Sequence, residues 1–133
     1  MLPPCFYRVS TKALIVRNEK VLLVMEADGK WELPGGGLEV GESFESGLRR
    51  EIKEEIGVAL LAISKQPIYT WTLVVEEENA SITPKVILVF KATVDSFNFV
   101  GNSAESLKIE FFSKEEMRKL NLHPNIKELP NVL

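Results

Sequence analysis

The chain of 133 residues carries 45% hydrophobic and 26% charged side chains, a composition typical of a single globular domain spanning residues 1–133. Its formal charge of −3 at pH 7 excludes a general basic field for duplex nucleic acid, so a phosphate-bearing substrate would need a bound cation or a few local basic side chains. With no apolar run of about 18 residues, no signal-like N-terminus and a single cysteine, Cys5, we expect a soluble cytoplasmic protein without a membrane span.

Two β-rich segments open the chain, residues 8–17 (RVSTKALIVR) and 20–26 (KVLLVME). Asn18 and Glu19 between them suit a hairpin turn, so we predict that the two segments pair antiparallel. The segment 31–37 (WELPGGG) follows. Because it contains a proline and three glycines, we predict an irregular loop whose backbone can approach a ligand closely.

A helix is predicted from its N-cap, Ser43, to Ile56, with Gly57 at the position where helices usually end. Its apolar side chains recur at every fourth residue and predict a stripe that faces a core. The stripe consists of Phe44, Leu48, Ile52 and Ile56.

Residues 68–75 and 85–94 are predicted strands of a long hairpin, and the polar stretch 76–84 between them is interpreted as a solvated turn. Residues 106–112 are the last strand candidate. Strands mixed with helices in this order indicate an α/β layered domain built on a mixed sheet.

The C-terminal part begins with Ser113, which opens a capping box and predicts a short helix to about Leu120. The tail from Asn121 contains Pro124 and Pro130, and we predict that it is irregular.

Three carboxylates in the mid-chain helix, Glu51, Glu54 and Glu55, stand at positions i, i+3 and i+4 and share one face. Like charges at this spacing destabilise a helix by about 0.2–0.5 kcal/mol per pair. Glu55 also borders the apolar stripe, so it does not simply face water. A hard divalent cation explains the arrangement, because carboxylate oxygens are the ligands that Mg²⁺ and Mn²⁺ prefer.

The glycines at positions 35, 36 and 37 come shortly before this helix. A backbone carbonyl there could join the metal ligands, and backbone amides could contact phosphate oxygens. The segment resembles neither a dinucleotide fingerprint nor a P-loop, since acids follow it instead of Gly-Lys-Ser/Thr. Metal ions between these acids and a diphosphate would turn repulsion into attraction.

The segment Gly36–Val58 (GGLEVGESFESGLRREIKEEIGV) resembles the Nudix box, Gly-x5-Glu-x7-Arg-Glu-U-x-Glu-Glu-x-Gly-U with U apolar, at all nine specified positions. The box covers 23 of 133 residues, and the order of the flanking elements is also similar to that of MutT-like Nudix hydrolases. The resemblance implies the Nudix fold, an α/β/α sandwich around a mixed β-sheet. It also implies metal-dependent hydrolysis of the diphosphate linkage of a nucleoside diphosphate-X.

The resemblance assigns roles residue by residue. Arg50 matches the arginine that orients a neighbouring glutamate, and Glu42 matches a supporting glutamate at the start of the helix. Gly36 matches the glycine whose carbonyl joins the cations. The acids that match the cation ligands are Glu51, Glu54 and Glu55.

Many members of the family add an acid from a loop before the last strand. Glu105 is the candidate for this extra metal ligand or for the general base, a role for which Glu51 is the alternative. Glu105 is equally well explained as an exposed loop glutamate. Glu110 is its rival, although its place in a strand limits its reach.

Substrate contacts are expected from Gly36 and Gly37, and from Trp31 by stacking on a base. Tyr69 and Trp71 are further stacking candidates, but aromatic residues in strands more often belong to a core. His123, the single histidine, lies in the tail and is not assigned to catalysis.

The function favoured at this stage is a nucleoside triphosphate pyrophosphohydrolase that uses Mg²⁺ or Mn²⁺ and releases a nucleoside monophosphate and pyrophosphate. The runner-up acts on ADP-ribose or another nucleotide sugar. A catalytically silent nucleotide-sensing domain is the alternative of another class, and an isoprenyl diphosphate isomerase would need a catalytic cysteine for which Cys5 is poorly placed. A small nucleotide is the expected partner, and a homodimer is possible as in many relatives.

Overall fold

The computed structural model describes residues 1, 4–76, 79, 81–101 and 106–133. The predictions for Glu77, Glu78 and Glu105 therefore lie outside the described residues. Strands and helices follow one another in the order β1 (Arg8–Leu14), β2 (Val16–Arg17), β3 (Lys20–Glu26), β4 (Trp31–Glu32), β5 (Gly35–Gly37), α1 (Phe44–Ile56), β6 (Leu60–Ile63), β7 (Tyr69–Glu76), β8 (Ile82–Val94), β9 (Ser106–Phe112), α2 (Lys114–Met117), the 3₁₀ helix η1 (Pro124–Ile126) and α3 (Leu129–Val132).

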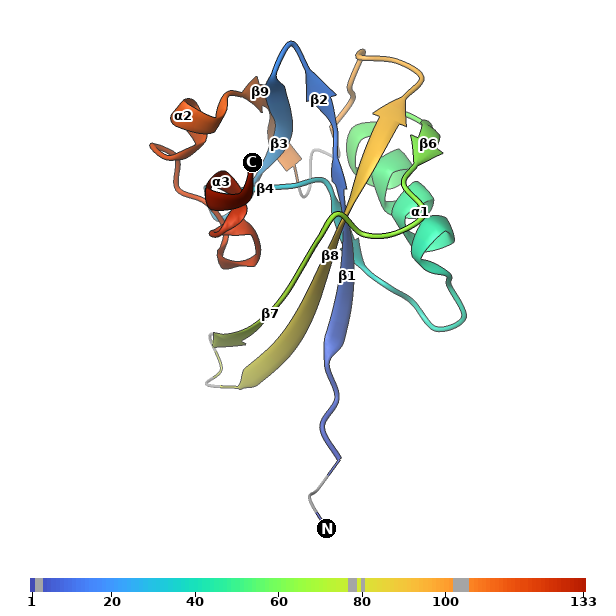
Figure 1. Cartoon of the computed structure of the whole chain (residues 1–133), viewed down its shortest axis with the longest axis vertical. Coiled ribbons are helices and arrows are strands. Elements are labelled where there is room, and N and C mark those ends of the chain that lie inside the picture. Colours follow the sequence, from blue (N-terminus) through green and yellow to red (C-terminus); the bar gives the residue numbers. More distant parts are fainter. Residues whose placement is uncertain (2–3, 77–78, 80, 102–105) are drawn as a thin grey trace.

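The strands form two sheets between helices (Figure 1). In the larger sheet the order is β5-β1-β8-β6, and β7 pairs with the first part of β8. Strands β1 and β8 run parallel, whereas β5, β6 and β7 pair antiparallel with their neighbours. In the smaller sheet β3 pairs antiparallel with β2, β4 and β9. This confirms the mixed sheet of the predicted α/β fold.

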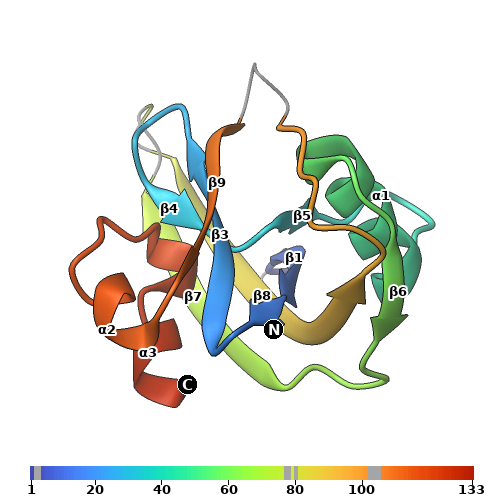
Figure 2. The same cartoon turned by 90° about the horizontal axis from the view of Figure 1, so that it is seen from above.

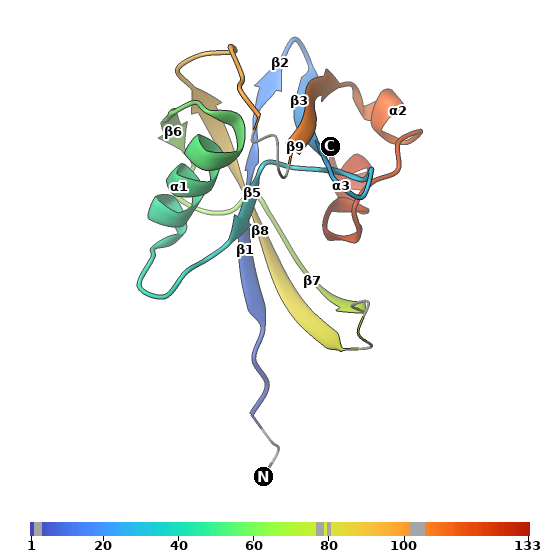
Figure 3. The same cartoon turned by 180° about the vertical axis from the view of Figure 1, so that it is seen from behind.

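Helix α1 lies on one side of the sheets, and α2 and α3 lie on the other (Figure 2). Two buried clusters correspond to these sides. The first joins Leu48, Ile52 and Ile56 of α1 to the sheets. The second joins Ile126 and Leu129 of the C-terminal segment to their other face. Seen from behind, β7, the first part of β8 and the start of β1 extend away from the helices (Figure 3).

The predicted antiparallel pairing of residues 8–17 with 20–26 is correct only for its end. Strand β2 pairs with β3 across Asn18 and Glu19, which both adopt positive φ. The longer part, β1, instead runs parallel to β8 and antiparallel to β5. The chain passes from one sheet into the other near Ile15, a change that the β-propensity of a continuous apolar segment does not mark.

The prediction of an irregular loop over residues 31–37 was wrong. Trp31–Glu32 forms β4 against β3, and Gly35–Gly37 forms β5 against β1. Glycine is unfavourable in a strand on its own, but it permits a close approach to another backbone. A Cβ on Gly35 would lie 2.9 Å from the Lys12 Cα, and its φ of +135° also excludes most other residues. The glycines therefore let a strand pass where side chains would not fit.

Four other elements also differ from the prediction. Strand β6 was not predicted, and β8 begins at Ile82, so the turn after β7 is shorter than residues 76–84. The tail from Asn121 is not irregular, because η1 and α3 bury Ile126 and Leu129 in the second core. The capping box at Ser113 is confirmed, although α2 ends at Met117.

Helix α1 forms as predicted. Ser43 is its N-cap, and Gly57 ends it in the left-handed conformation with φ of 74°. Of the predicted stripe, Leu48, Ile52 and Ile56 are fully buried, whereas Phe44 is 47% exposed and rests against Phe90 at the edge of the core. None of the helices in the described ranges is long and apolar enough to cross a membrane.

Candidate active site

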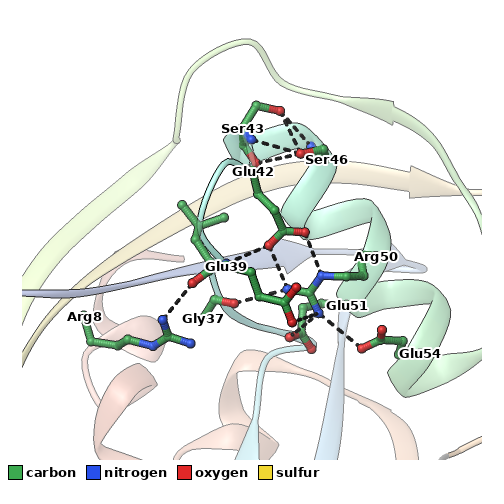
Figure 4. Close-up of polar contacts among 10 residues, drawn as sticks. Arg8, Gly37, Glu39, Glu42, Ser43, Ser46, Arg50, Glu51 and Glu54 are labelled. Atoms are coloured by element: carbon green, nitrogen blue, oxygen red, sulfur yellow. Dashed lines mark hydrogen bonds and ion pairs between the residues drawn. The ribbon is translucent and has the colours of Figure 1, made fainter.

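The first turn of α1 places the acidic face of the helix beside β5. Ser43 Oγ accepts from the Ser46 amide at 3.0 Å, and Ser46 Oγ accepts from the Ser43 amide at 2.9 Å (Figure 4). These reciprocal bonds satisfy two backbone donors that a helix terminus otherwise leaves open. They fix where the helix starts, and therefore which side chains face the glycine strand.

Arg50 connects the acids of the site (Figure 4). Its Nε and Nη2 donate to the two carboxylate oxygens of Glu42 at 2.7 and 2.9 Å, and Nη1 donates to Glu51 at 3.0 Å and Glu54 at 3.2 Å. Nη2 also donates to the Gly37 carbonyl at 3.3 Å. A bidentate guanidinium–carboxylate pair is strongly directional, so Glu42 fixes the plane in which Arg50 approaches the other acids.

This pairing shifts both partners toward their charged forms. The hydrogen bonds from Arg50, followed by the Glu39 amide, lower the pKa of Glu42 to about 2. The Glu42 carboxylate in turn raises the pKa of Arg50. In the structure Glu42 thus holds the Arg50 guanidinium in place, and its supporting role in catalysis stays a prediction.

The three box acids have different surroundings. Glu51 and Glu54 share the Nη1 group of Arg50, and the Glu54 side chain is 60% exposed. Glu55 points toward the protein interior instead. Within the described residues, no three acidic, histidine or cysteine side chains form a ready-made metal cluster. Arg50 offsets the repulsion between the Glu51 and Glu54 carboxylates, which carry like charges on one face of the helix.

Glu55 is the most perturbed carboxyl of the site. Burial, with a smaller contribution from neighbouring Glu51, raises its pKa to about 8, while Lys12 opposes the shift. Its Oε1 atom is buried without a hydrogen-bond partner among the described residues. An unpartnered buried carboxyl oxygen is costly, and oxygen-rich donor sets suit Mg²⁺ and Mn²⁺. The residues present therefore fit a divalent cation.

Gly36 makes room for Glu51. A Cβ on Gly36 would lie 2.6 Å from Glu51 Cδ and 2.7 and 2.8 Å from its oxygens, so a side chain there would displace the carboxylate. The lack of a side chain at Gly36 thus allows a carboxylate of α1 to rest directly on the backbone of β5.

The Gly36 carbonyl is directed into the sheet. Leu38 N donates to Val9 O, and Ala13 N donates to Pro34 O, so the alternation of an antiparallel ladder directs the Gly36 carbonyl toward Thr11 of β1. Gly35, one residue earlier, points its carbonyl away from β1, and the Lys12 Nζ lies 3.4 Å from that oxygen. The expected carbonyl ligand is therefore better placed at Gly35, because register decides which carbonyls leave the sheet.

A second group of polar residues lies buried beside these acids. Lys12 and Glu32 are 4% and 1% exposed, and Lys12 Nζ lies 3.6 Å from Glu32 Oε2. Asn125 Nδ2 donates to the same oxygen at 3.0 Å. His123 Nδ1 accepts from the Asn125 amide at 3.0 Å, and burial lowers the pKa of His123. The same Nδ1 atom lies 3.3 Å from Glu32 Oε2.

The aromatic candidates for base stacking belong to the core. Trp31 is 6% exposed and meets Phe112 edge to face at 4.7 Å. Tyr69 Oη donates to the Val132 carbonyl at 2.9 Å, and Trp71 Nε1 donates to the Asn125 carbonyl at 2.7 Å. These bonds hold the C-terminal segment against β7. The burial of Trp31 argues against its expected role in substrate stacking.

Two further candidates are placed differently. Glu105 lies outside the described residues, so its role stays a prediction. Glu110 is exposed in the middle of β9, opposite Leu23 of β3. Cys5 is exposed near the N-terminus.

Sequence reasoning missed three basic or acidic residues that contact this region: Arg8, Lys12 and Glu32. Lys12 interrupts an apolar strand and Glu32 stands between Trp31 and Leu33, so charge within a buried pattern was the available signal. Arg8 gave no such signal, because its role depends on the pairing of β1 with β5.

Known proteins resemble this chain in both sequence and structure. Nucleoside triphosphatase NudI of Escherichia coli O1:K1 is 52% identical over 65 residues, which cover 44% of this chain and 44% of that protein. The chain thus spans less than half the length of the curated relatives it matches.

Solved structures extend the similarity over most of the fold. The NUDIX hydrolase from Nitrosomonas europaea has a TM-score of 0.76 at 27% identity, covering 96% of this chain and 87% of that one. A UDP-X diphosphatase has a TM-score of 0.73 at 25% identity, covering 93% and 58%. The family model described as NUDIX domain matches residues 6–131. The acids of α1, the glycine strand beside them and this match together show that the chain belongs to the NUDIX domain family.

Proposed function

We propose that this protein hydrolyses the diphosphate linkage of a nucleoside diphosphate-X with the help of Mg²⁺ or Mn²⁺. The best candidate substrate is a nucleoside triphosphate, cleaved to a nucleoside monophosphate and pyrophosphate. The proposal applies to residues on one face of α1 and on the neighbouring strand β5.

The observation that carries the proposal is the burial of the Glu55 carboxyl group. A buried carboxyl whose oxygen lacks a partner among the described residues is unfavourable unless a bound group compensates it. Glu51 stands on the preceding turn of the helix, and its carboxylate lies against Gly36. Both acids belong to the family box, so the same residues that destabilise the free protein would stabilise a complex with a cation.

Each residue has a defined task in this proposal. Glu51, Glu54 and Glu55, with the Gly35 carbonyl, would hold the cations. A bound divalent cation neutralises phosphoryl oxygens and lowers the pKa of water. Arg50, fixed by Glu42, keeps Glu51 and Glu54 aligned.

The reaction itself is a displacement at phosphorus. Glu51, or alternatively Glu105, accepts a proton from the attacking water. The water oxygen forms a bond to one phosphorus while the bridging P–O bond breaks, and the leaving phosphate takes the electron pair. Gly36 and Gly37 of β5 are the backbone positions proposed to contact the phosphates, and the Glu51 carboxylate and the Arg8 guanidinium lie in the space beside them.

The preference for triphosphates rests on the sequence similarity to a nucleoside triphosphatase over 65 residues. The structural likeness to a UDP-X diphosphatase supports nucleotide sugars as the second candidate. The box would engage only the diphosphate that these substrates share, so the choice between them depends on residues outside the box.

The test is a panel of nucleoside triphosphates, ADP-ribose and UDP-sugars, each incubated with the full chain and Mg²⁺ or Mn²⁺. Phosphate is measured after coupling to inorganic pyrophosphatase, which detects pyrophosphate, or to a phosphatase, which detects phosphomonoesters. We expect pyrophosphate from triphosphates and none from the variant Glu55→Gln. Phosphomonoesters from UDP-sugars alone would favour the second candidate. Nucleotide binding without turnover of any substrate would contradict the proposal and favour a sensing domain.

A further inference from the structure

Arg8 makes two contacts with the backbone that leads from β5 to α1. Its Nη1 donates to the Leu38 carbonyl at 2.7 Å, and its guanidinium lies directly on Gly37, in the space that a Cβ would occupy (Figure 4). Arg8 itself is exposed at the start of β1. The contact is therefore not required to fill a core.

Arg50 holds the same backbone from the side of the helix. Its Nη2 donates to the Gly37 carbonyl at 3.3 Å, so two guanidiniums contact consecutive carbonyls, one from β1 and one from α1. Beyond Leu38 the chain turns toward α1 through hydrogen bonds between Glu39 and Glu42, with Val40 fully exposed and Gly41 at a φ of 86°. Arg8 thus anchors the last residues before this turn.

The anchored backbone is part of the proposed metal site. Gly36 precedes Gly37 and lies against the Glu51 carboxylate, and Gly35 points its carbonyl out of the β1–β5 ladder, where the Lys12 Nζ lies 3.4 Å from it. A shift at Gly37 and Leu38 would move both features, because Gly35–Gly37 is a short strand held on one side by β1. The position of Arg8 and the geometry of the cation ligands are therefore linked through three peptide units.

We propose that Arg8 is a positioning residue for the divalent cation: by lying on Gly37 and donating to Leu38, it keeps the Gly35–Leu38 backbone aligned with the carboxylates of α1. The inference rests on the proposed function, because it assumes that these carboxylates bind a cation. A planar guanidinium suits this role, since it packs flat on a glycine while its edge donates a hydrogen bond; a lysine ammonium does not.

The direction of the change in cation affinity distinguishes a positioning role of Arg8 from a simple effect of its positive charge. Removing a positive charge near a cation site strengthens cation binding by Coulomb's law. Loss of a positioning contact weakens it, and loss of groups that orient metal ligands typically weakens binding about 10–100-fold. The two explanations therefore predict opposite changes for Arg8→Ala.

The experiment measures Mn²⁺ binding to the metal-free full chain, without nucleotide, by calorimetry and by the loss of the free-ion electron paramagnetic resonance signal. The variants are Arg8→Ala, Arg8→Lys, Gly37→Ala and the double variant Arg8→Ala/Gly37→Ala. Arg17→Ala, which removes an equal charge from β2 where Arg17 lies 4.2 Å over Phe97, is the control. Circular dichroism checks that each variant folds.

Arg8→Ala should bind Mn²⁺ about 10–100-fold more weakly than the unmodified chain, with Arg17→Ala unchanged. Gly37→Ala should have a similar effect, because its Cβ expels the guanidinium. The double variant should be no weaker than either single variant, since both remove the same contact. Arg8→Lys should not restore binding.

Unchanged or tighter Mn²⁺ binding by Arg8→Ala would overturn the inference, as would equal losses in Arg8→Ala and Arg17→Ala. Additive losses in the double variant would also overturn it. If the unmodified chain binds no Mn²⁺, the proposed function fails; if it binds Mn²⁺ and Arg8→Ala binds equally well, the inference alone fails.

Discussion

Two glutamates near the glycine strand show how position sets the chemistry of a carboxyl group. Glu42 accepts hydrogen bonds from Arg50 and the Glu39 amide, and its pKa falls to about 2. Glu55 is buried among other acids, and its pKa rises to about 8. The first carboxyl is held in its charged form beside Arg50, whereas burial favours the protonated form of the second, which under the proposed function would give up this proton to a metal ion.

Glu55→Gln should separate stability from activity. At pH 8 in the presence of EDTA, its free energy of unfolding should equal or exceed that of the unmodified chain, because a neutral amide replaces a carboxyl that burial disfavours when charged. With Mg²⁺, kcat should fall at least about a hundredfold because a metal ligand is lost. Urea denaturation and steady-state kinetics measure the two effects. A large loss of stability with normal turnover would contradict this assignment.

Gly36→Ala should displace the Glu51 carboxylate, since the new Cβ would lie 2.6 Å from Glu51 Cδ. We expect weaker Mn²⁺ binding and a lower kcat, measured by calorimetry and kinetics. Gly29→Ala is the control: a Cβ there meets no described atom within 4 Å, although its φ of +80° makes the substitution cost about 1 kcal/mol of stability. Equal kcat values for the two variants would argue against the role of Gly36.

At the scale of elements, the capping residues at its two ends fix where α1 begins and ends. The capping box at Ser43 and the left-handed Gly57 leave little freedom in where the helix begins and stops. Arg49 adds a bond from the helix to the Leu60 carbonyl of β6. The acids in the middle of the helix are therefore presented to β5 in a fixed order.

Ser43→Ala should lower the free energy of unfolding by about 1 kcal/mol, because it leaves the Ser46 amide without its acceptor. Chemical denaturation of Ser43→Ala, Ser46→Ala and the double variant measures the effect. The double variant should lose less than the sum of the two single losses, since each removes part of one reciprocal pair. Simple additivity would show that the two hydroxyls act independently.

Local signals explain which elements could be predicted from the sequence. Helix α1, the turn at Asn18 and Glu19 and the capping box at Ser113 each carry their own signature within a few residues. Strand β5 and the helical tail depend on distant partners, since β5 forms against β1 and the tail packs against β7. Tertiary contacts decide such segments, and propensity alone does not report them.

The same limit applied to the candidate site. The acids of α1 could be assigned because helical periodicity puts them on one face. The direction of the Gly36 carbonyl depends on the register of β5 with β1, and the contact of Arg8 with Leu38 depends on the same register. Neither the carbonyl direction nor the Arg8 contact could be predicted from the sequence alone.

At the scale of the whole molecule, three basic side chains surround one short strand of a protein whose net charge is negative. Lys12, Arg50 and Arg8 contact the carbonyls of Gly35, Gly37 and Leu38, respectively. These basic side chains come from β1 and α1, which both contact β5, while the net charge of the chain is −3. The glycine strand thus lies at the point where the sheet and the acidic helix meet.

Metal binding should be linked to pH across the whole protein. The folded pKa of Glu55, about 8, lies above its unfolded value of about 4.5, so its contribution to metal-free stability is full below about pH 4.5 and is lost as the pH rises through 8. Mn²⁺ must displace this proton. Calorimetry in buffers of different ionisation enthalpy should therefore show proton release at pH 7 and tighter binding as the pH rises toward 8. Mn²⁺ affinity independent of pH between 6 and 8 would contradict this linkage.

The most direct test of the account is a crystal structure of the full chain with Mn²⁺ and a non-hydrolysable nucleoside triphosphate analogue, with Mn²⁺ located by anomalous scattering. We predict at least one Mn²⁺ bound by the carboxylates of Glu51 and Glu55, within reach of the Gly35 carbonyl and of the analogue's phosphates. Anomalous peaks that avoid these two carboxylates, or phosphates bound elsewhere on the molecule, would contradict it.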